Sequence, residues 1–110
     1  MYISKRAILI DFTNEQEALD SIDPFMHSIK NFYLNLLEYT GPLALNGPPF
    51  NDITRDFKHF ISIFKSLKMY MSNKEKNYVM TGFEYTEDLI NQIKNDRKLL
   101  MRFESPHFEN

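Results

Sequence analysis

The feature that most constrains this chain is a run of apolar residues at helical spacing in its middle. Steps of mostly three and four residues place these side chains on one face of a helix. The other face carries basic and hydroxyl residues, so the pattern predicts an amphipathic helix that Asn51 or Asp52 caps and that runs to about Met71. The apolar residues are Ile53, Phe57, Phe60, Ile61, Phe64, Leu67 and Met71, and the polar face holds Arg55, Lys58, His59, Ser62, Lys65, Ser66 and Lys68.

Capping signals predict two further helices before the central one, a long helix directly before it and a short helix nearer the N-terminus. Asp23 followed by Pro24 is typical of a helix start, and Gly41-Pro42 supplies a stop signal. The apolar face between them predicts a helix from about Pro24 to Tyr39. Upstream, Asn14-Glu15-Gln16-Glu17 matches a capping box and predicts a short helix to about Ile22.

The last third of the chain is predicted to hold two helices. Ser72-Asn73-Lys74-Glu75 is a capping box that opens a short helix to about Thr81, closed by Gly82. Thr86 is then expected to cap a final helix. Asp96 lies on the apolar face of that helix, which indicates either a rim position or a polar contact to a partner or a neighbouring helix.

These elements favour an all-α fold, a small bundle of about four to five helices in a single domain spanning residues 1–110. The alternative is an α+β fold in which the N-terminal segment, Ile3 to Phe12, pairs with a strand over residues 78–85. Residues 41–50 are expected to form an apolar loop rich in Pro and Gly, and a short polar tail is expected from about residue 105.

The composition excludes several kinds of chemistry. The chain has no Cys, which excludes disulfides, thiolate metal sites and a thiol nucleophile, and favours a cytoplasmic location. The apolar run after Lys5 and Arg6 ends at Asp11, too early for an export signal. No apolar run approaches the length of roughly 20 residues that crosses a membrane, so no membrane association is expected.

One set of residues has the composition of a hydrolytic triad. Asp56, His59 and Ser62 follow one another at steps of three residues on the polar face of the central helix. Parallel side chains on successive turns do not converge around an imidazole, as a triad requires. Asp56 and His59 would need a third ligand to hold a metal, and His27 and His107 are distant in sequence.

The three glycines, Gly41, Gly47 and Gly82, form no phosphate-binding fingerprint. With no catalytic motif present, the chain is expected not to be an enzyme and to need no metal or cofactor. Carboxylates far apart in sequence that meet in the fold would be the exception.

Charge is strongly segregated along the chain. The stretch from Asp11 to Thr54 has seven acids and one base, and the stretch from Arg55 to Lys76 has six bases and two acids. Segregated charge steers association with partners of opposite charge. Acids with interleaved aromatic residues suit a basic protein partner, because the charges speed encounter and the aromatic rings supply desolvated contacts.

The expected function is therefore stoichiometric protein binding, in the form of an immunity or antitoxin protein that neutralises a basic, nuclease-like bacterial toxin. The residues expected to bind this partner are Glu15, Glu17, Asp20, Asp23, Glu38, Tyr39, Glu84, Tyr85, Glu87 and Asp88. The alternative is a regulatory or nucleic-acid-associated module that uses the basic helix face over residues 55–76. An isoelectric point near 5.9 and the acidic stretch oppose binding to a polyanion.

Overall fold

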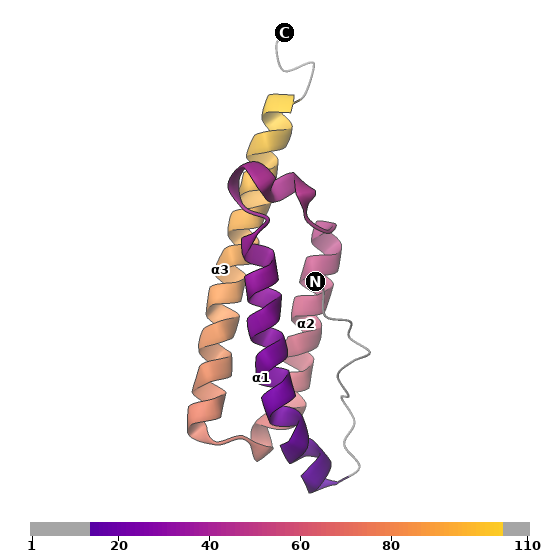
Figure 1. Ribbon diagram of the computed structural model, residues 1–110, viewed down its shortest axis with the longest axis vertical. Helices are drawn as coiled ribbons and strands as arrows, with labels where there is room; N and C mark the ends of the chain where they lie inside the picture. Colours follow the sequence, from indigo (N-terminus) through magenta and orange to yellow (C-terminus); the bar gives the residue numbers. More distant parts are fainter. Residues whose placement is uncertain (1–13, 105–110) are drawn as a thin grey trace.

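The fold is a bundle of three α-helices joined by two short 3₁₀ helices, in a computed structural model that describes residues 14–104 (Figure 1). Within that range there is no strand. Helices α1 and α3 run in the same direction, α2 runs against them, and α3 extends past both at its C-terminal end. The elements are α1 (Glu15–Leu37), η2 (Gly41–Asn46), α2 (Phe50–Leu67), η3 (Lys68–Tyr70) and α3 (Asn73–Glu104). The all-α prediction is confirmed.

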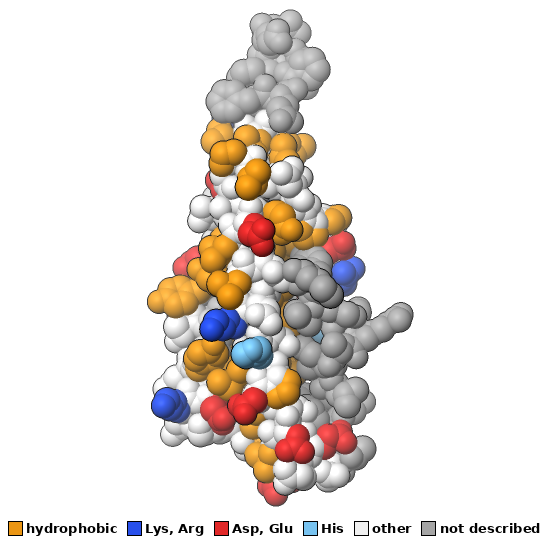
Figure 2. All heavy atoms as spheres, viewed as in Figure 1, with side chains coloured by type: hydrophobic (Ala, Val, Ile, Leu, Met, Phe, Trp, Pro, Cys, Tyr) orange, Lys and Arg blue, Asp and Glu red, His pale blue; other side chains and the backbone are white. Residues whose placement is uncertain are grey.

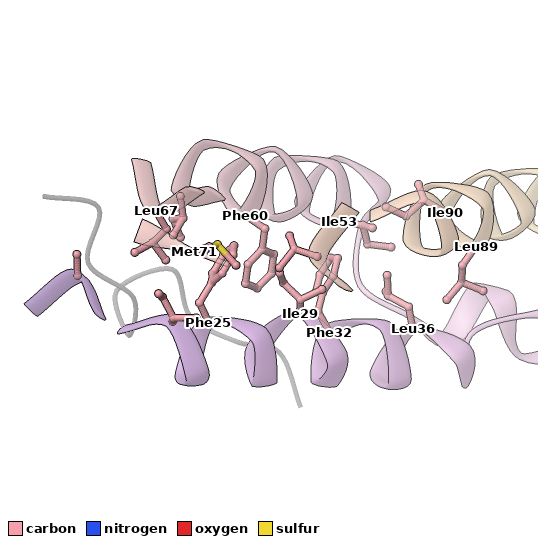
Figure 3. Close-up of a cluster of buried hydrophobic side chains, with 14 of the residues drawn as sticks. Phe25, Ile29, Phe32, Leu36, Ile53, Phe60, Leu67, Met71, Leu89 and Ile90 are labelled. Carbon is pink, nitrogen blue, oxygen red and sulfur yellow. The ribbon is translucent and has the colours of Figure 1, made fainter. Parts of the chain in front are cut away.

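The core lies along the axis between the three helices. At its centre the ring of Phe60 from α2 packs against Phe25 and Phe32 from α1, with ring centroids 6.2 and 5.2 Å apart. Figure 3 shows these rings pointing toward one another. A second aromatic contact joins α2 to α3, where Phe57 and Phe64 both pack edge-on against Phe83. Aromatic pairs of this kind add stability beyond the area that they bury.

The central helix is confirmed, but it is shorter than predicted at its C-terminal end, and it begins at Phe50 after Pro49, so the predicted cap at Asn51 or Asp52 is wrong. Of its predicted apolar face, Ile53, Phe60 and Leu67 are buried, whereas Phe57, Ile61 and Phe64 are only partly buried. Ile63, which was not predicted on this face, is fully buried. The α-helical hydrogen bonds end at Leu67 rather than at Met71, and η3 follows. Met71 is nevertheless buried, because the tighter 3₁₀ turn carries it back onto the core.

In α1, the prediction of two helices divided at Asp23-Pro24 is wrong. The Asn14 side chain accepts a hydrogen bond from the backbone N–H of Glu17 at 2.8 Å, so the first predicted helix start is correct. The helix then continues through Pro24 to Leu37, so Asp23 lies inside the helix and is not a cap. The apolar face is continuous across the proline, so burial of that face outweighs the hydrogen bond that proline cannot donate.

In α3, the capping box is confirmed but the predicted break is wrong. The Ser72 N–H donates to Glu75 Oε1 at 2.8 Å, and the Glu75 N–H donates to Ser72 Oγ at 3.1 Å. The helix runs on through Gly82, and the strand over residues 78–85 does not form. Thr86 is no cap: its buried hydroxyl donates to the Gly82 carbonyl at 2.7 Å within the helix.

Gly82 and Gly47 provide a matched pair of substitutions with opposite expected effects. A Cβ at Gly82 would lie 3.5 Å from Ile29 Cγ2, an ordinary contact, so Gly82→Ala should stabilise the protein by about 0.5–1 kcal/mol through helix propensity. A Cβ at Gly47 would lie 2.7 Å from Arg97 Nη2 and 2.8 Å from Tyr39 Cγ, so Gly47→Ala should destabilise it. Urea unfolding of both variants measures these changes. A loss of stability in Gly82→Ala would contradict the spacing between α1 and α3.

The apolar segment between α1 and α2 is partly folded back and partly exposed. Gly41 has a φ of +57°, the left-handed conformation that glycine adopts without strain, and it ends the turn after α1. Ala44 of η2 is fully buried and Phe50 packs against the core, whereas Leu43 and Leu45 are exposed. The predicted loop therefore contributes to the core through only part of its apolar residues.

Two consecutive residues of α3 hold this segment in place. Asp96 Oδ2 accepts a hydrogen bond from the Gly41 N–H at 2.7 Å. Arg97 donates from Nε to the Ala44 carbonyl at 2.8 Å and from Nη2 to the Pro48 carbonyl at 2.7 Å. Of the interpretations of Asp96, the polar contact to a neighbouring helix is confirmed, and that helix is the 3₁₀ helix η2.

The predicted N-terminal segment (residues 3–12) and polar tail (from residue 105) lie outside the described residues.

Candidate functional site

A hollow of the described surface lies between α1 and α3 and has a volume of about 440 Å³. We call it the α1–α3 groove. Figure 2 shows hydrophobic side chains gathering along these two helices on the left of the visible face, with basic side chains among them. The lining residues are Ile29, Lys30 and Tyr33 of α1 and Lys74, Asn77, Tyr78, Thr81, Gly82 and Tyr85 of α3.

The groove follows from the sequence of α3. Gly82 has no side chain, so it leaves the groove open beside Ile29, which also lines it. Tyr78 and Tyr85 lie seven residues apart, which places both rings on the same side of the helix. Their exposed fractions are 46% and 61%, so each ring presents a large apolar area to solvent.

Charges border the groove in a regular arrangement. Lys30 and Lys74 are the charged residues that line it. Asp88 lies seven residues beyond Thr81 and fourteen beyond Lys74, hence on the same side of α3, and Asp23 lies seven residues before Lys30 on α1. All four side chains are exposed. The ion pairs found among residues 14–104 involve Arg55 with Asp52 and Asp56, and none of these four.

The acidic residues predicted on α1 do not form one compact patch. Glu15, Asp20, Asp23 and Glu38 are exposed, and Glu17 is half-buried. Asp20 accepts a hydrogen bond from Gln16 Nε2 at 2.8 Å. Glu15 and Glu38 lie at opposite ends of α1, about 35 Å apart at 1.5 Å per residue. Only the acids of the first turns lie close together.

The second predicted cluster, residues 84–88, is distributed around α3. Consecutive helical residues point about 100° apart. Tyr85 lines the α1–α3 groove, whereas Glu87 lines a different hollow between α2 and α3. Glu84 and Asp88 are exposed, and the intervening Thr86 is buried. Tyr39, also predicted at the interface, is half-buried and packs against the core.

The hollow between α2 and α3 has a volume of about 330 Å³ and combines bases with apolar residues. Lys58 of the predicted basic face lines this hollow together with Lys94 of α3. Lys94 lies 36 residues further along the chain, and no sequence pattern predicts that the two lysines lie close together. Glu87 also lines this hollow, so its charged residues are two lysines and one acid rather than lysines alone.

The residues resembling a triad are not assembled as one. Asp56 was predicted on the solvated face, but it is buried and accepts a hydrogen bond from Arg55 Nε at 3.4 Å. Asp56 lies three residues after Ile53 and four residues before Phe60, so the helix places its side chain on the buried side. Within the described part of the chain, His59 Nε2 is buried without a hydrogen-bond partner, Ser62 is exposed, and no hydrogen bond joins any two of these three side chains.

The described residues contain no group of three or more side chains placed to hold a metal ion. Between residues 14 and 104, no helix combines the length and the apolar character that crossing a membrane requires. Comparison with known proteins found no matching family model, no matching curated protein and no matching solved structure.

Proposed function

We propose that this protein works by stoichiometric binding to another protein chain, and that the α1–α3 groove is a binding face. The observation that carries the proposal is the half-exposed pair Tyr78 and Tyr85 beside the apolar side chain of Ile29. Exposed aromatic residues that gather on one face are typical of protein interfaces, where they supply most of the contact energy.

The shape of the groove favours a protein chain over a small ligand. Small-molecule sites enclose most of the ligand surface. Here the walls are exposed tyrosines and lysines along two helices, so a small ligand would keep one side in water. An elongated apolar surface from another chain covers both walls at once.

The test blocks the groove at its centre. Thr81 is exposed and lines the groove, and Ser62 is exposed on α2 and does not line it. We expect tagged wild-type protein and Ser62→Arg to recover the same protein in near-equal amount from the cells that make it. Thr81→Arg should lose that protein while keeping a native helical spectrum. Equal recovery with all three proteins would exclude the groove from binding.

The narrower proposal is that one partner is a basic protein, such as a nuclease-like toxin that this chain neutralises. It is supported by the exposed acids at the start of α1, Glu15, Asp20 and Asp23, which make no ion pair with any base of residues 14–104. Exposed acids without bound bases raise the rate of encounter with a basic surface.

Reversing the charge of Glu17, Asp20 and Asp23 to Lys should slow association with that partner by about tenfold or more and flatten its dependence on salt. Stopped-flow or surface-based association kinetics at low and high salt measure both effects. The neutral triple variant, with Glu17→Gln, Asp20→Asn and Asp23→Asn combined, serves as the intermediate control and should show a smaller reduction. Unchanged association rates in the reversed variant would remove these acids from the interface.

A further inference from the structure

We propose that the occupant of the α1–α3 groove is a second copy of this chain, packed face to face and antiparallel about a two-fold axis that passes beside Thr81. This inference rests on the proposed function, because both require the α1–α3 groove to bind a protein chain. An isologous interface demands that a face be complementary to itself. The positions of charged and aromatic residues on this face meet that demand.

The charges on α3 are complementary under this symmetry. Lys74 and Asp88 lie seven residues before and seven residues after Thr81, on the same side of the helix. An antiparallel partner centred on Thr81 therefore places Lys74 of each copy opposite Asp88 of the other. Both side chains are exposed and make no ion pair with another of residues 14–104.

The aromatic residues of α3 obey the same symmetry. Tyr78 lies three residues before Thr81 and Tyr85 lies four residues after it. The two-fold operation thus sets Tyr78 of one copy against Tyr85 of the other, twice per dimer. These four half-exposed rings would be covered in one contact, and aromatic pairs are favourable contacts at interfaces.

The side of α1 that borders the groove is also complementary to itself about the same two-fold axis. The close approach of Gly82 to Ile29 places residues 28–29 of α1 level with residues 81–82 of α3. Leu19 and Leu37 lie nine residues on either side of residue 28, and both are exposed, at 43% and 42%. The two-fold axis sets Leu19 of one copy opposite Leu37 of the other. Asp23 then lies about 4.5 Å along the axis from Lys30 of the partner, within the reach of a lysine side chain.

The face is large enough for a specific dimer. From Leu19 to Leu37 the α1 wall is about 27 Å long, and two helices side by side are roughly 20 Å wide. The projected area of about 540 Å², increased by side-chain relief, is on the scale of the 800 Å² or so that each partner contributes to a standard interface.

The dimer leaves Asp20 and Glu38, two of the acids predicted to bind a basic partner, accessible, whereas Asp23 faces Lys30 of the other copy. Asp20 and Glu38 lie on the outward side of α1, and the two-fold operation brings Asp20 of one copy toward Glu38 of the other at the exposed edge. Water screens this repulsion. A basic partner that binds there would relieve it, so the dimer and a basic partner are compatible.

Charge exchange tests the register directly. Sedimentation velocity should show wild-type protein as a dimer in equilibrium with monomer. Lys74→Glu alone and Asp88→Lys alone each create two like-charge contacts per dimer, and each should raise the dimer dissociation constant by about tenfold or more. The double variant restores opposite charges and should return close to the wild-type constant. Lys98→Glu, on an exposed part of α3 outside the groove, is the matched control and should change little.

Three results would overturn the dimer: wild-type protein that is monomeric over a wide concentration range, single variants that dimerise like wild type, or a double variant that is not rescued. If wild-type protein is monomeric and the Thr81→Arg variant nevertheless fails to capture the partner, the dimer is overturned and the proposed function stands. If wild-type protein is monomeric and the Thr81→Arg variant captures the partner as well as wild type does, both the dimer and the proposed function are overturned.

Discussion

Phe32→Ala is expected to lower the free energy of unfolding by about 3–5 kcal/mol. Phe32 is almost fully buried, and its ring packs against Phe60 at the centre of the bundle. Truncation removes the apolar area that the ring buries and leaves a cavity between α1 and α2, which close-packed helices fill only in part.

Urea unfolding followed by circular dichroism measures this loss. Leu34→Ala is the matched control, because Leu34 lies on the same helix and is 46% exposed. Its truncation should change stability by less than about 0.5 kcal/mol. A loss below about 1 kcal/mol for Phe32→Ala would contradict the packing of Phe32 against Phe60.

Arg97→Ala is expected to lower the free energy of unfolding by about 2–4 kcal/mol. The guanidinium donates to two carbonyls of the segment between α1 and α2, those of Ala44 and Pro48. Its removal leaves the carbonyl of the buried Ala44 without this donor. Arg97→Lys should restore little, because an ammonium group does not reproduce the two donors held in a fixed plane.

Hydrogen exchange adds a readout specific to this segment. In Arg97→Ala, the amide of Leu43, which donates to the Thr40 carbonyl, should exchange faster than in wild type, while amides of the core helices change less. Lys98→Ala, which changes the exposed neighbouring residue, should leave this exchange unaltered. Wild-type exchange at Leu43 in Arg97→Ala would show that the segment is held by other contacts.

The sequence predicted the all-α class and most of the apolar face of α2, because that face has a clear period, but it missed the buried positions of Asp56 and Ile63. It failed where a local signal opposed a continuous apolar face. Pro24, Gly82 and Thr86 are a helix breaker, a typical helix end and a typical cap, yet all three lie inside long helices. Burial against neighbouring helices outweighs such signals, and a local pattern does not report that burial.

The candidate site was harder to predict, because its two walls come from segments about 50 residues apart. Tyr85 was predicted as a binding residue, but together with Glu87, which the helix carries to a different hollow of α3. The seven-residue spacing of Tyr78 and Tyr85 was the available signal, and it becomes visible only when residues 73–104 are recognised as one helix. The role of Arg97 is not visible in the sequence, because its carbonyl partners come from a segment with no periodicity.

The most direct test of the proposed interface uses a single introduced thiol, since the chain contains no Cys. Thr81→Cys places that thiol beside the two-fold axis, and Ser62→Cys places it on exposed α2 away from the groove. With a short thiol-specific crosslinker, we predict rapid conversion of Thr81→Cys to a covalent dimer and slow conversion of Ser62→Cys. Equal, slow crosslinking of both variants would contradict the proposal that two copies meet at the α1–α3 groove.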